Sequence, residues 1–272
     1  MSTPGYFQPF QPLLSANAQK PLGLTVIESR PSNALGRLVH SFIQVRSAQP
    51  LVYATIPDAL PTFFIGPKQT LCASFVSRVV ELPIQAGVDY FGIRFRPGAL
   101  KALFDVDLNL IGEKVVDALC LGNQNIGSLH HALYHFTSFE QRVAHCESVL
   151  GAIPTNGPTE KFADALAIIY SSQGNLGIGS CLAKTLQMSS RQLNRMFREY
   201  VGVSAKCFAA VVRAHGVCEY LYGMPKQSLV ASSLYGYFDQ SHLLNDFKQR
   251  FLLSPRPFFE RFRSDFYNIS ET

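Results

Sequence analysis

Two segments in the second half of the chain combine amide, hydroxyl and basic side chains with a regular apolar pattern. They are SSRQLNRMFREYVG, residues 189–202, and GYFDQSHLLNDFKQ, residues 236–249. Leu and Phe recur at helical spacing in both, which predicts a buried face and an opposite polar face. Arginine can pair bidentately with guanine, and asparagine or glutamine with adenine, in the major groove of DNA. The polar faces are therefore suited to contact base edges.

The candidate residues form two groups according to their position along each predicted helix. Residues near the helix starts are predicted to contact bases: Arg191, Asn194, Arg195, Gln240, Ser241, His242 and Asn245. Basic residues that come later are better placed for phosphates, which position a protein without reading sequence: Arg198, Lys206, Lys248 and Arg250. The pattern leaves one alternative open, because solvated charges on an exposed helix look the same.

The two segments belong to a repeat with a period of 50 residues. The shift places Leu193 on Leu243, Phe197 on Phe247, Arg198 on Lys248, Ser204 on Ser254 and Phe208 on Phe258. Short helix, tight turn and second helix, repeated twice, is the pattern of two helix-turn-helix units. Any two amphipathic helices can be aligned in this way, but here the match continues past the helix.

Start and stop residues predict the helices that hold these segments. Ser189 or Ser190 is expected to cap the first recognition helix and Asp239 the second, with Gly236 in the turn. A helix is predicted to open at Thr159 and to close at Gly174. A short helix in residues 179–187 and a long helix from about 204 to 222 complete the predicted helices between the two segments.

The first half has a different texture. Pro and Gly separate runs rich in β-branched and aromatic residues, which predict strands at 42–46, 51–56, 62–66, 74–82 and 90–95. Phe91, Ile93 and Phe95 alternate with other residues, as in a strand with one buried face. From Pro97 to about residue 150, including EKVVDALCL at 113–121, the pattern is helical. We therefore predict a multi-domain α+β chain: a β-rich domain finished by helices, followed by an all-α domain.

Composition and charge agree with a division of the chain into two domains. The segment GAIPTNGP suggests a linker at 151–158, between a domain at 1–150 and one at 159–272. Residues 159–272 carry 13 Lys/Arg against 9 Asp/Glu, which favours a nucleic-acid-binding module there. No apolar run is long enough to span a bilayer and no secretory signal is visible, so a cytoplasmic protein without membrane contact is expected.

The pattern LAKTLQMSSRQLNRMF…GVSAKCF…GYFDQSHLLNDFKQ…SPRPFFERFR resembles the AraC/XylS family of transcription regulators over about residues 160–265. The resemblance implies double-stranded DNA as partner, with the recognition helices in successive major grooves about 34 Å apart. It also implies RNA polymerase as a partner if the protein is an activator. The chain departs from the family pattern at Ala205, where a Pro is common, and at Asn245, where a basic residue is common.

The first half resembles the β-rich, often cupin-like domains that accompany this module, which implies sensing of a small molecule or dimerisation. Arg94 and Arg96 precede a predicted helix start and could hold a carboxylated effector, or could simply be structural. The aromatic residues of the strands could line a cavity or fill a core. A front domain that binds a protein partner instead of a ligand stays open.

Enzymatic and cofactor chemistry finds little support in the sequence. The same DNA-binding module occurs in alkylation-response proteins that transfer methyl groups to cysteine, which makes a cysteine-based alkyl transfer an alternative. The six cysteines, however, are widely spaced without a C-x-x-C pair. No phosphate-binding or dinucleotide motif is present, and His131 and His135 lack the neighbouring Glu of a zinc-hydrolase helix. We expect no catalytic residues, no metal and no cofactor.

Overall fold

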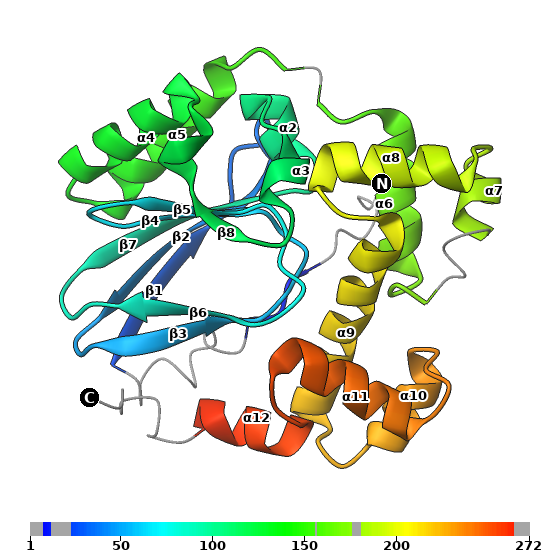
Figure 1. The fold of residues 1–272 in the computed structure, drawn as a ribbon. Helices are drawn as coiled ribbons and strands as arrows, with labels where there is room; N and C mark the ends of the chain where they lie inside the picture. Colours follow the sequence, from blue (N-terminus) through cyan, green and yellow to red (C-terminus); the bar gives the residue numbers. More distant parts are fainter. Residues whose placement is uncertain (1–7, 12–22, 156, 176–180, 264–272) are drawn as a thin grey trace.

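The computed structural model describes residues 8–11, 23–155, 157–175 and 181–263. A β-rich front half is followed by an all-helical back half (Figure 1), which confirms the predicted fold class. The two halves lie against each other, with the strands on one side and the long helix α9 (Ala205–Gly223) on the other.

The front half is built from two antiparallel sheets. The larger sheet has the strand order β1-β2-β7-β4-β5-β8, and β3 pairs with β6 in the smaller one. The strands are β1 (Leu24–Ser29), β2 (Val39–Ser47), β3 (Leu51–Thr55), β4 (Thr62–Ile65), β5 (Thr70–Ala73), β6 (Val80–Ile84), β7 (Asp89–Phe95) and β8 (Val115–Asp117).

The larger sheet buries both of its faces. Ile43 and Val45 pack in one cluster with residues of β3 and β6, while Phe42 of the same strand packs in a second cluster with the helices. Phe91, Ile93 and Phe95 share that second cluster, as the alternation predicted. The helices that follow the strands are α2 (Ala99–Phe104), α3 (Leu108–Ile111), η2 (Ala118–Leu121), α4 (Gln124–His135) and α5 (Phe139–Ala152). Figure 1 shows α4 and α5 covering the sheet.

Two of the predicted elements were wrong. Residues 74–79 of the expected strand 74–82 are irregular, and the N–H of Val79 donates to the carbonyl of Arg250, 2.8 Å away in the back half. In the expected helix 113–121, Val115–Asp117 instead forms β8, which pairs with β5. Both errors have one cause, because partners remote in sequence supply hydrogen bonds that local patterns do not reveal.

The back half contains the predicted series of short helices around one long helix. They are α6 (Glu160–Ser171), α7 (Ala183–Thr185), α8 (Ser190–Val201), α9 (Ala205–Gly223), α10 (Ser228–Leu234), α11 (Gln240–Phe251) and α12 (Pro255–Arg263). Thr159 occupies the N-cap position of α6, and Gly174 follows it at a positive φ of 71°. Residues 179 and 180 of the predicted helix 179–187 lie outside the described residues; α7 covers only part of the remainder.

The 50-residue repeat is confirmed by burial. Leu193 and Leu243 are both buried, as are Phe197 and Phe247. Phe208 of α9 and Phe258 of α12 are buried in the same way. The apolar faces that the repeat predicted therefore form the cores of two helical units.

The two halves share hydrophobic clusters. Val217 and Leu221 of α9 belong to the cluster that contains Ile43 of the front half. The rings of Phe75 and Phe208, one from each half, have centroids 6.0 Å apart. Packing across the two halves is thus extensive and apolar.

Within the described ranges, no single helix is long and apolar enough to cross a membrane; only α8 and α9 taken together, bent by 65°, reach the required length and composition.

Candidate nucleic-acid interface

Helix α8 is fixed at both ends by its own sequence. The Ser189 hydroxyl accepts from the Gln192 N–H at 3.2 Å and the Gln192 side chain accepts from the Ser189 N–H at 2.8 Å, a capping box. At the other end Gly202 adopts a left-handed φ of 86°. Ser189 is therefore the N-cap of α8. The sequence had offered either Ser189 or Ser190 for this role.

The outer face of α8 is basic. Arg191, Arg195 and Arg198 are all exposed and follow a spacing of four and three residues, which places them on one side of the helix. Asn194 is half-buried, and its Oδ1 accepts from the Ala205 N–H at 3.3 Å, at the start of α9. Asn194 therefore caps α9, and only its amide N–H groups stay available for a base.

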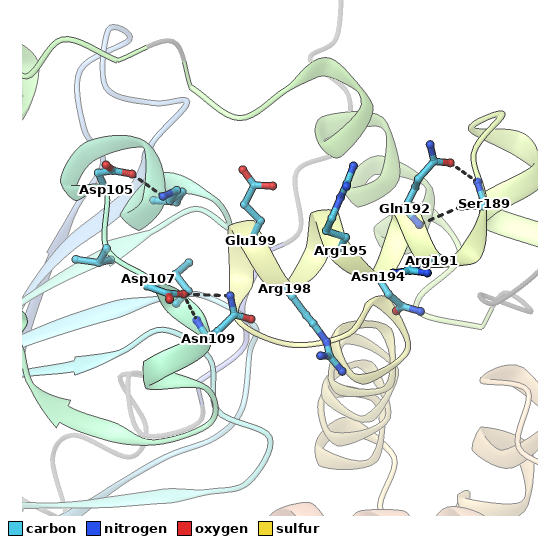
Figure 2. A pocket seen from close by; sticks show the side chains of 13 residues that line it. Asp105, Asp107, Asn109, Ser189, Arg191, Gln192, Asn194, Arg195, Arg198 and Glu199 are labelled. Carbon is cyan, nitrogen blue, oxygen red and sulfur yellow. Dashed lines mark hydrogen bonds and ion pairs between the residues drawn. The ribbon is translucent and has the colours of Figure 1, made fainter.

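A cleft of about 840 Å³ separates this basic face from the front half (Figure 2). One wall is α8, and the opposite wall is the α2–α3 segment with Asp105 and Asp107. Lys101 pairs with Asp105 at 2.5 Å, and Asp107 caps α3 by accepting from Asn109 N–H at 3.0 Å. The C-terminal end of α8 meets this wall directly, since a Cβ on Gly202 would lie 2.5 Å from the Leu108 carbonyl oxygen.

Helix α11 is positioned by a turn and a cap. Gly236 has a φ of 65°, and the Asp239 side chain accepts from the His242 N–H at 2.7 Å, as predicted. Tyr237, just before the cap, is buried and donates to Asp246 at 2.7 Å. These contacts fix where the polar face of α11 begins.

The predicted base-contacting residues of α11 lie on its surface. Ser241, His242 and Asn245 are exposed, as is Lys248 one turn further on. Gln240 is exposed too, but its amide N–H donates to Ser228 of α10 at 2.5 Å. The ring of His242 packs edge-on against Tyr237, with centroids 5.2 Å apart. The second unit thus presents mainly neutral hydrogen-bonding groups.

Arg250 is not part of this exposed surface. Its Nε donates to Asp246 at 3.0 Å, and its Nη1 donates to the Ser77 carbonyl of the front half at 3.3 Å. The side chain is only 13% exposed. The structure therefore assigns Arg250 to the contact between the halves and contradicts its expected role with phosphates. Lys206 of α9, by contrast, is exposed.

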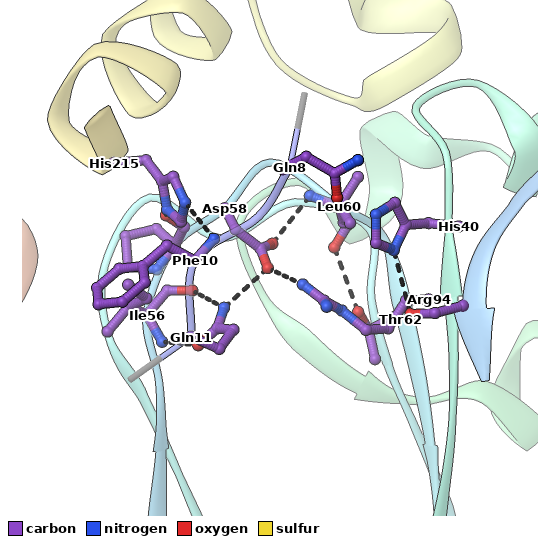
Figure 3. Close-up of polar contacts among 12 residues, drawn as sticks. Gln8, Phe10, Gln11, His40, Ile56, Asp58, Leu60, Thr62, Arg94 and His215 are labelled. Carbon is purple, nitrogen blue, oxygen red and sulfur yellow. Dashed lines mark hydrogen bonds and ion pairs between the residues drawn. The ribbon is translucent and has the colours of Figure 1, made fainter. Parts of the chain in front are cut away.

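The expected effector residues Arg94 and Arg96 are engaged internally. Arg94 is buried and pairs with the buried carboxylate of Asp58 (Figure 3). The Nε of Arg96 donates to the Gly36 carbonyl at 2.6 Å. The buried carboxylate of Asp58 already balances the charge of Arg94, so Arg94 does not need an anionic ligand.

A small cavity of about 60 Å³ lies beside the Arg94–Asp58 pair. Most of its walls are apolar, among them Ile43, Tyr53 and Phe64. Its polar lining residues are Gln11, Thr55, Asp58, Thr62 and Arg94, and Asp58 bonds to both Gln11 and Arg94. The Gln11 amide donates to Asp58 Oδ2 at 2.8 Å and to the Ile56 carbonyl at 2.9 Å.

Gln11 lines the cavity, and its neighbour Phe10 contacts the helical half. The Phe10 N–H, next to Gln11, donates to Nε2 of His215 on α9 at 2.8 Å (Figure 3). Nδ1 of the same ring lies 2.9 Å from the Pro57 carbonyl, next to Asp58. Since Nε2 accepts, Nδ1 must be the protonated nitrogen and the ring is neutral. Burial lowers the pKa of His215, in keeping with the neutral form.

Sequence reasoning missed two features of the interface. Phe238, directly before the Asp239 cap, is 92% exposed. Asp105 and Asp107 stand opposite the basic face of α8. The sequence places two aromatic residues, Tyr237 and Phe238, side by side before the cap, but it does not show which of them is exposed. The position of the two aspartates depends on packing between the halves, which no local pattern shows.

The described part of the chain holds no metal-binding cluster, and its cysteines form no disulfide. No group of three or more His, Cys, Asp or Glu side chains there is arranged to hold a metal ion. All six cysteines are free thiols. Burial raises the pKa of Cys72 to about 12, which opposes formation of a nucleophilic thiolate.

Family models cover both halves. Residues 182–261 match a helix-turn-helix domain family, and residues 27–117 match a domain of unknown function, DUF6597. No curated protein matches the sequence.

Three solved structures illustrate the likeness. The C-terminal domain of AraT, a response regulator from Geobacillus stearothermophilus, is 23% identical over 42% of this chain and 91% of its own, with a TM-score of 0.36. ToxT from Vibrio cholerae O395, bound to (E)-4-(8-methylnaphthalen-1-yl)but-3-enoic acid, is 10% identical over 88% and 98%, with a TM-score of 0.39. Unsaturated fatty acid bound ToxT from strain SCE256 is 9% identical over 87% and 94%, with a TM-score of 0.35.

The helix-turn-helix match and the basic face of α8 define the class of the back half, which is a DNA-binding domain. More particularly, the back half is an AraC-type helix-turn-helix DNA-binding domain, preceded by a β-rich domain. This confirms the resemblance that the repeated motifs indicated.

Proposed function

We propose that the protein is a cytoplasmic regulator that binds a specific double-stranded DNA sequence through α8 and α11. The observation that carries the proposal is the repeat: each helix buries Leu and Phe while exposing groups that match base edges. Arg191 and Arg195 supply the readout of the first unit, with Asn194 contributing its amide. Ser241, His242 and Asn245 supply that of the second, with Gln240 beside them. Arg198, Lys206 and Lys248 hold phosphates.

The test is selection of DNA by the purified full-length protein from a random library. We expect one motif with two blocks about one helical turn, roughly 34 Å, apart. Arg195→Ala should lose the preference at one position of the first block. Arg37→Ala, which removes an exposed arginine of the front half, is the matched control and should select the wild-type motif. A library that shows no enriched motif with the wild-type protein contradicts the proposal.

The proposed domain division is a β-rich domain at 1–150, a linker at 151–158 and the DNA-binding domain at 159–272. It is supported by the end of α5 at Ala152 and the start of α6 at Glu160. Of the linker residues, all but 156 are described, and none beyond Ala152 is helical.

For the front domain we propose a small-molecule sensor whose ligand occupies the cavity beside Arg94 and Asp58. Mostly apolar walls with a few polar groups are the usual chemistry of a ligand pocket. The present volume of about 60 Å³ is far below that of most such pockets, so a ligand of ordinary size must push the lining apart. Because Asp58 neutralises Arg94, a small apolar molecule with a neutral polar head fits this site better than a carboxylate.

Hydrogen bonds of the neighbouring residues Gln11 and Phe10 connect the cavity to the DNA-binding domain. A ligand that takes the place of the Gln11 amide at Asp58 would shift Phe10, whose N–H holds His215 on α9. Helix α9 joins α8 to the second unit, so its position sets the relation of the two recognition helices. This coupling is what a ligand-controlled regulator requires.

Ligand-observed NMR with 1-propanol and propanoate tests the proposed chemistry. We expect the alcohol to bind more tightly than the acid, and we expect Ala73→Leu, which fills the cavity, to abolish binding while leaving DNA selection intact. Leu110→Ala is the control, because Leu110 is 79% exposed and outside the cavity. Tighter binding of propanoate would show that Arg94 is available to an anion and would overturn the preference.

The second candidate function of the front domain is dimerisation or binding of a protein partner. RNA polymerase is a further partner if the protein activates transcription. No described contact favours one of these over the others. Sedimentation of the full-length chain with and without DNA decides on dimerisation. Cysteine-based alkyl transfer finds no support at Cys72, because burial raises the pKa of its thiol.

A further inference from the structure

Phe238 is the most exposed of the large hydrophobic side chains that the structure describes, at 92%. Its neighbour Tyr237 is buried. A phenyl ring left in water gains nothing from the hydrophobic effect, and its apolar area is available to a partner.

The exposure is imposed by the surrounding contacts. The Tyr237 hydroxyl donates to Asp246 at 2.7 Å, and the Arg213 guanidinium lies 4.2 Å from the centre of the Tyr237 ring. The Phe238 N–H points to Nδ1 of His242 at 3.4 Å, and Asp239 caps the helix. With Tyr237 held inward and the backbone bonded on both sides, Phe238 is presented outward in a fixed position.

This position adjoins the proposed DNA-binding surface. Phe238 lies two residues before Gln240 and three before Ser241, at the N-terminal end of α11. In helix-turn-helix proteins the N-terminal residues of the recognition helix contact base edges. The apolar group that a base pair offers in the major groove is the C5 methyl of thymine, and Phe is among the side chains that contact it.

We infer that Phe238 packs against the C5 methyl group of a thymine in the DNA block bound by the second unit. Phe238 would then add an apolar contact to the neutral hydrogen-bonding groups of α11 and would favour thymine at one position. The inference rests on the proposed function and names a specificity-determining residue for it.

The experiment compares thymine with deoxyuridine, which differs only by the absence of the methyl group. The DNA motif selected by the wild-type protein is synthesised with one deoxyuridine at a time in the second block, and dissociation constants are measured by fluorescence anisotropy. For the wild-type protein we expect one position at which the change weakens binding about fourfold, the factor that burial of one methyl group gives. Phe238→Ala should bind the thymine DNA more weakly and show no difference between the two bases at that position.

Leu229→Ala is the matched control, since Leu229 is 67% exposed on α10 of the same unit. It should keep the wild-type ratio between thymine and deoxyuridine. Circular dichroism of each variant checks that the fold is retained, which the exposure of both side chains leads us to expect.

The outcomes separate the inference from the function on which it rests. If Phe238→Ala keeps the wild-type ratio at every position, or if the wild-type protein is indifferent to all substitutions in a motif that it does select, the inference alone is overturned. If the variant binds DNA as the wild type does but self-associates less, Phe238 is a protein contact and the inference is again overturned. A wild-type protein that selects no motif overturns both.

Discussion

The two helix-turn-helix units end their recognition helices in the same left-handed conformation but with different residues. Gly202 follows α8 at a φ of 86°, and Leu252, 50 residues later, follows α11 at 65°. Only glycine adopts this conformation without strain. The surroundings explain the difference: Gly202 lies against the Leu108 carbonyl with no room for a side chain, whereas Leu252 is 51% exposed. Contact with the front domain, and not helix termination itself, makes glycine necessary.

The largest effect is expected from breaking this asymmetry at the first unit. Gly202→Leu adds left-handed strain and drives a side chain into the Leu108 carbonyl, which should cost about 2–5 kcal/mol of the free energy of unfolding. Urea denaturation followed by circular dichroism measures it. A loss below 1 kcal/mol would mean that α3 moves away from α8 easily and that the contact does not constrain the helix.

Acid should lower the stability of the folded protein. Burial, followed by the charges of Arg94, Arg30 and Arg96, lowers the pKa of His40 to about 2, and burial lowers that of His215. Both rings stay neutral in the folded protein while the unfolded chain takes up protons below its pKa of about 6.5. Stability is therefore complete above pH 6.5 and falls as the pH drops, by up to about 1.4 kcal/mol per pH unit for His40, and His215 contributes in the same direction.

Urea titrations at several pH values between 5 and 7.5 measure this dependence. His40→Gln should remove the contribution of His40 and flatten the curve, while His215 and His130, whose pKa burial also lowers, keep part of the dependence. An unchanged stability between pH 7 and pH 5 in the wild type would show that both rings accept protons in the folded state.

Base readout should differ between the units because α8 is basic and α11 largely neutral. Arg195→Ala should cost about 1–3 kcal/mol of binding free energy and relax the preference at one base position of the first block only. Asn245→Ala should do the same in the second block. Competition binding with single-base variants of the selected motif measures both. If Arg195→Ala leaves specificity unchanged, Arg195 does not face a base edge.

Phosphate contacts give a smaller, non-specific effect. Lys248→Ala should weaken binding to all sequences alike and lower the slope of log K against log salt by about one. Arg250→Ala is the matched control two residues away, because its guanidinium is bound to Asp246 and Ser77. It should leave the salt slope unchanged while lowering stability. Equal salt slopes for Lys248→Ala and the wild type would remove Lys248 from the interface.

The smallest effect comes from correcting the strained residue of the second unit. Leu252→Gly relieves a left-handed leucine with room around it and should stabilise the protein by about 1 kcal/mol. Thermal denaturation detects the expected rise in Tm. A lower Tm would show that the half-exposed Leu252 side chain makes packing contacts that outweigh its backbone strain.

Local patterns predicted what local interactions determine. The Leu and Phe spacing gave the buried faces of α8 and α11, and the caps at Ser189 and Asp239 were found because a cap bonds to residues two or three positions away. The strands whose side chains alternate, such as β7, were found for the same reason. The family resemblance followed from these same motifs.

Most of the partners behind the errors lie far along the chain, although Asp246 is only four residues before Arg250. Arg250 looked like a phosphate contact, yet Asp246 and the Ser77 carbonyl bind it. Arg94 looked like an anion site, yet Asp58 balances it. Asn194 looked free to read a base, yet its oxygen caps α9. In each case the residue type was read correctly. The i,i+4 pair of Asp246 and Arg250 is visible in the sequence, but the other partners are not, because a sequence gives no distances between remote segments.

The packing of α9 against the front half also determines how the protein unfolds. Phe208 contacts Phe75, the ring of Tyr222 lies 5.0 Å from that of Phe10, and His215 is bonded to both Phe10 and Pro57. The core helix of the DNA-binding domain is thus completed by residues that precede it by more than a hundred positions. Heating should consequently melt both halves in one cooperative transition, and a fragment starting at residue 159 should be less stable than the same residues in the whole chain.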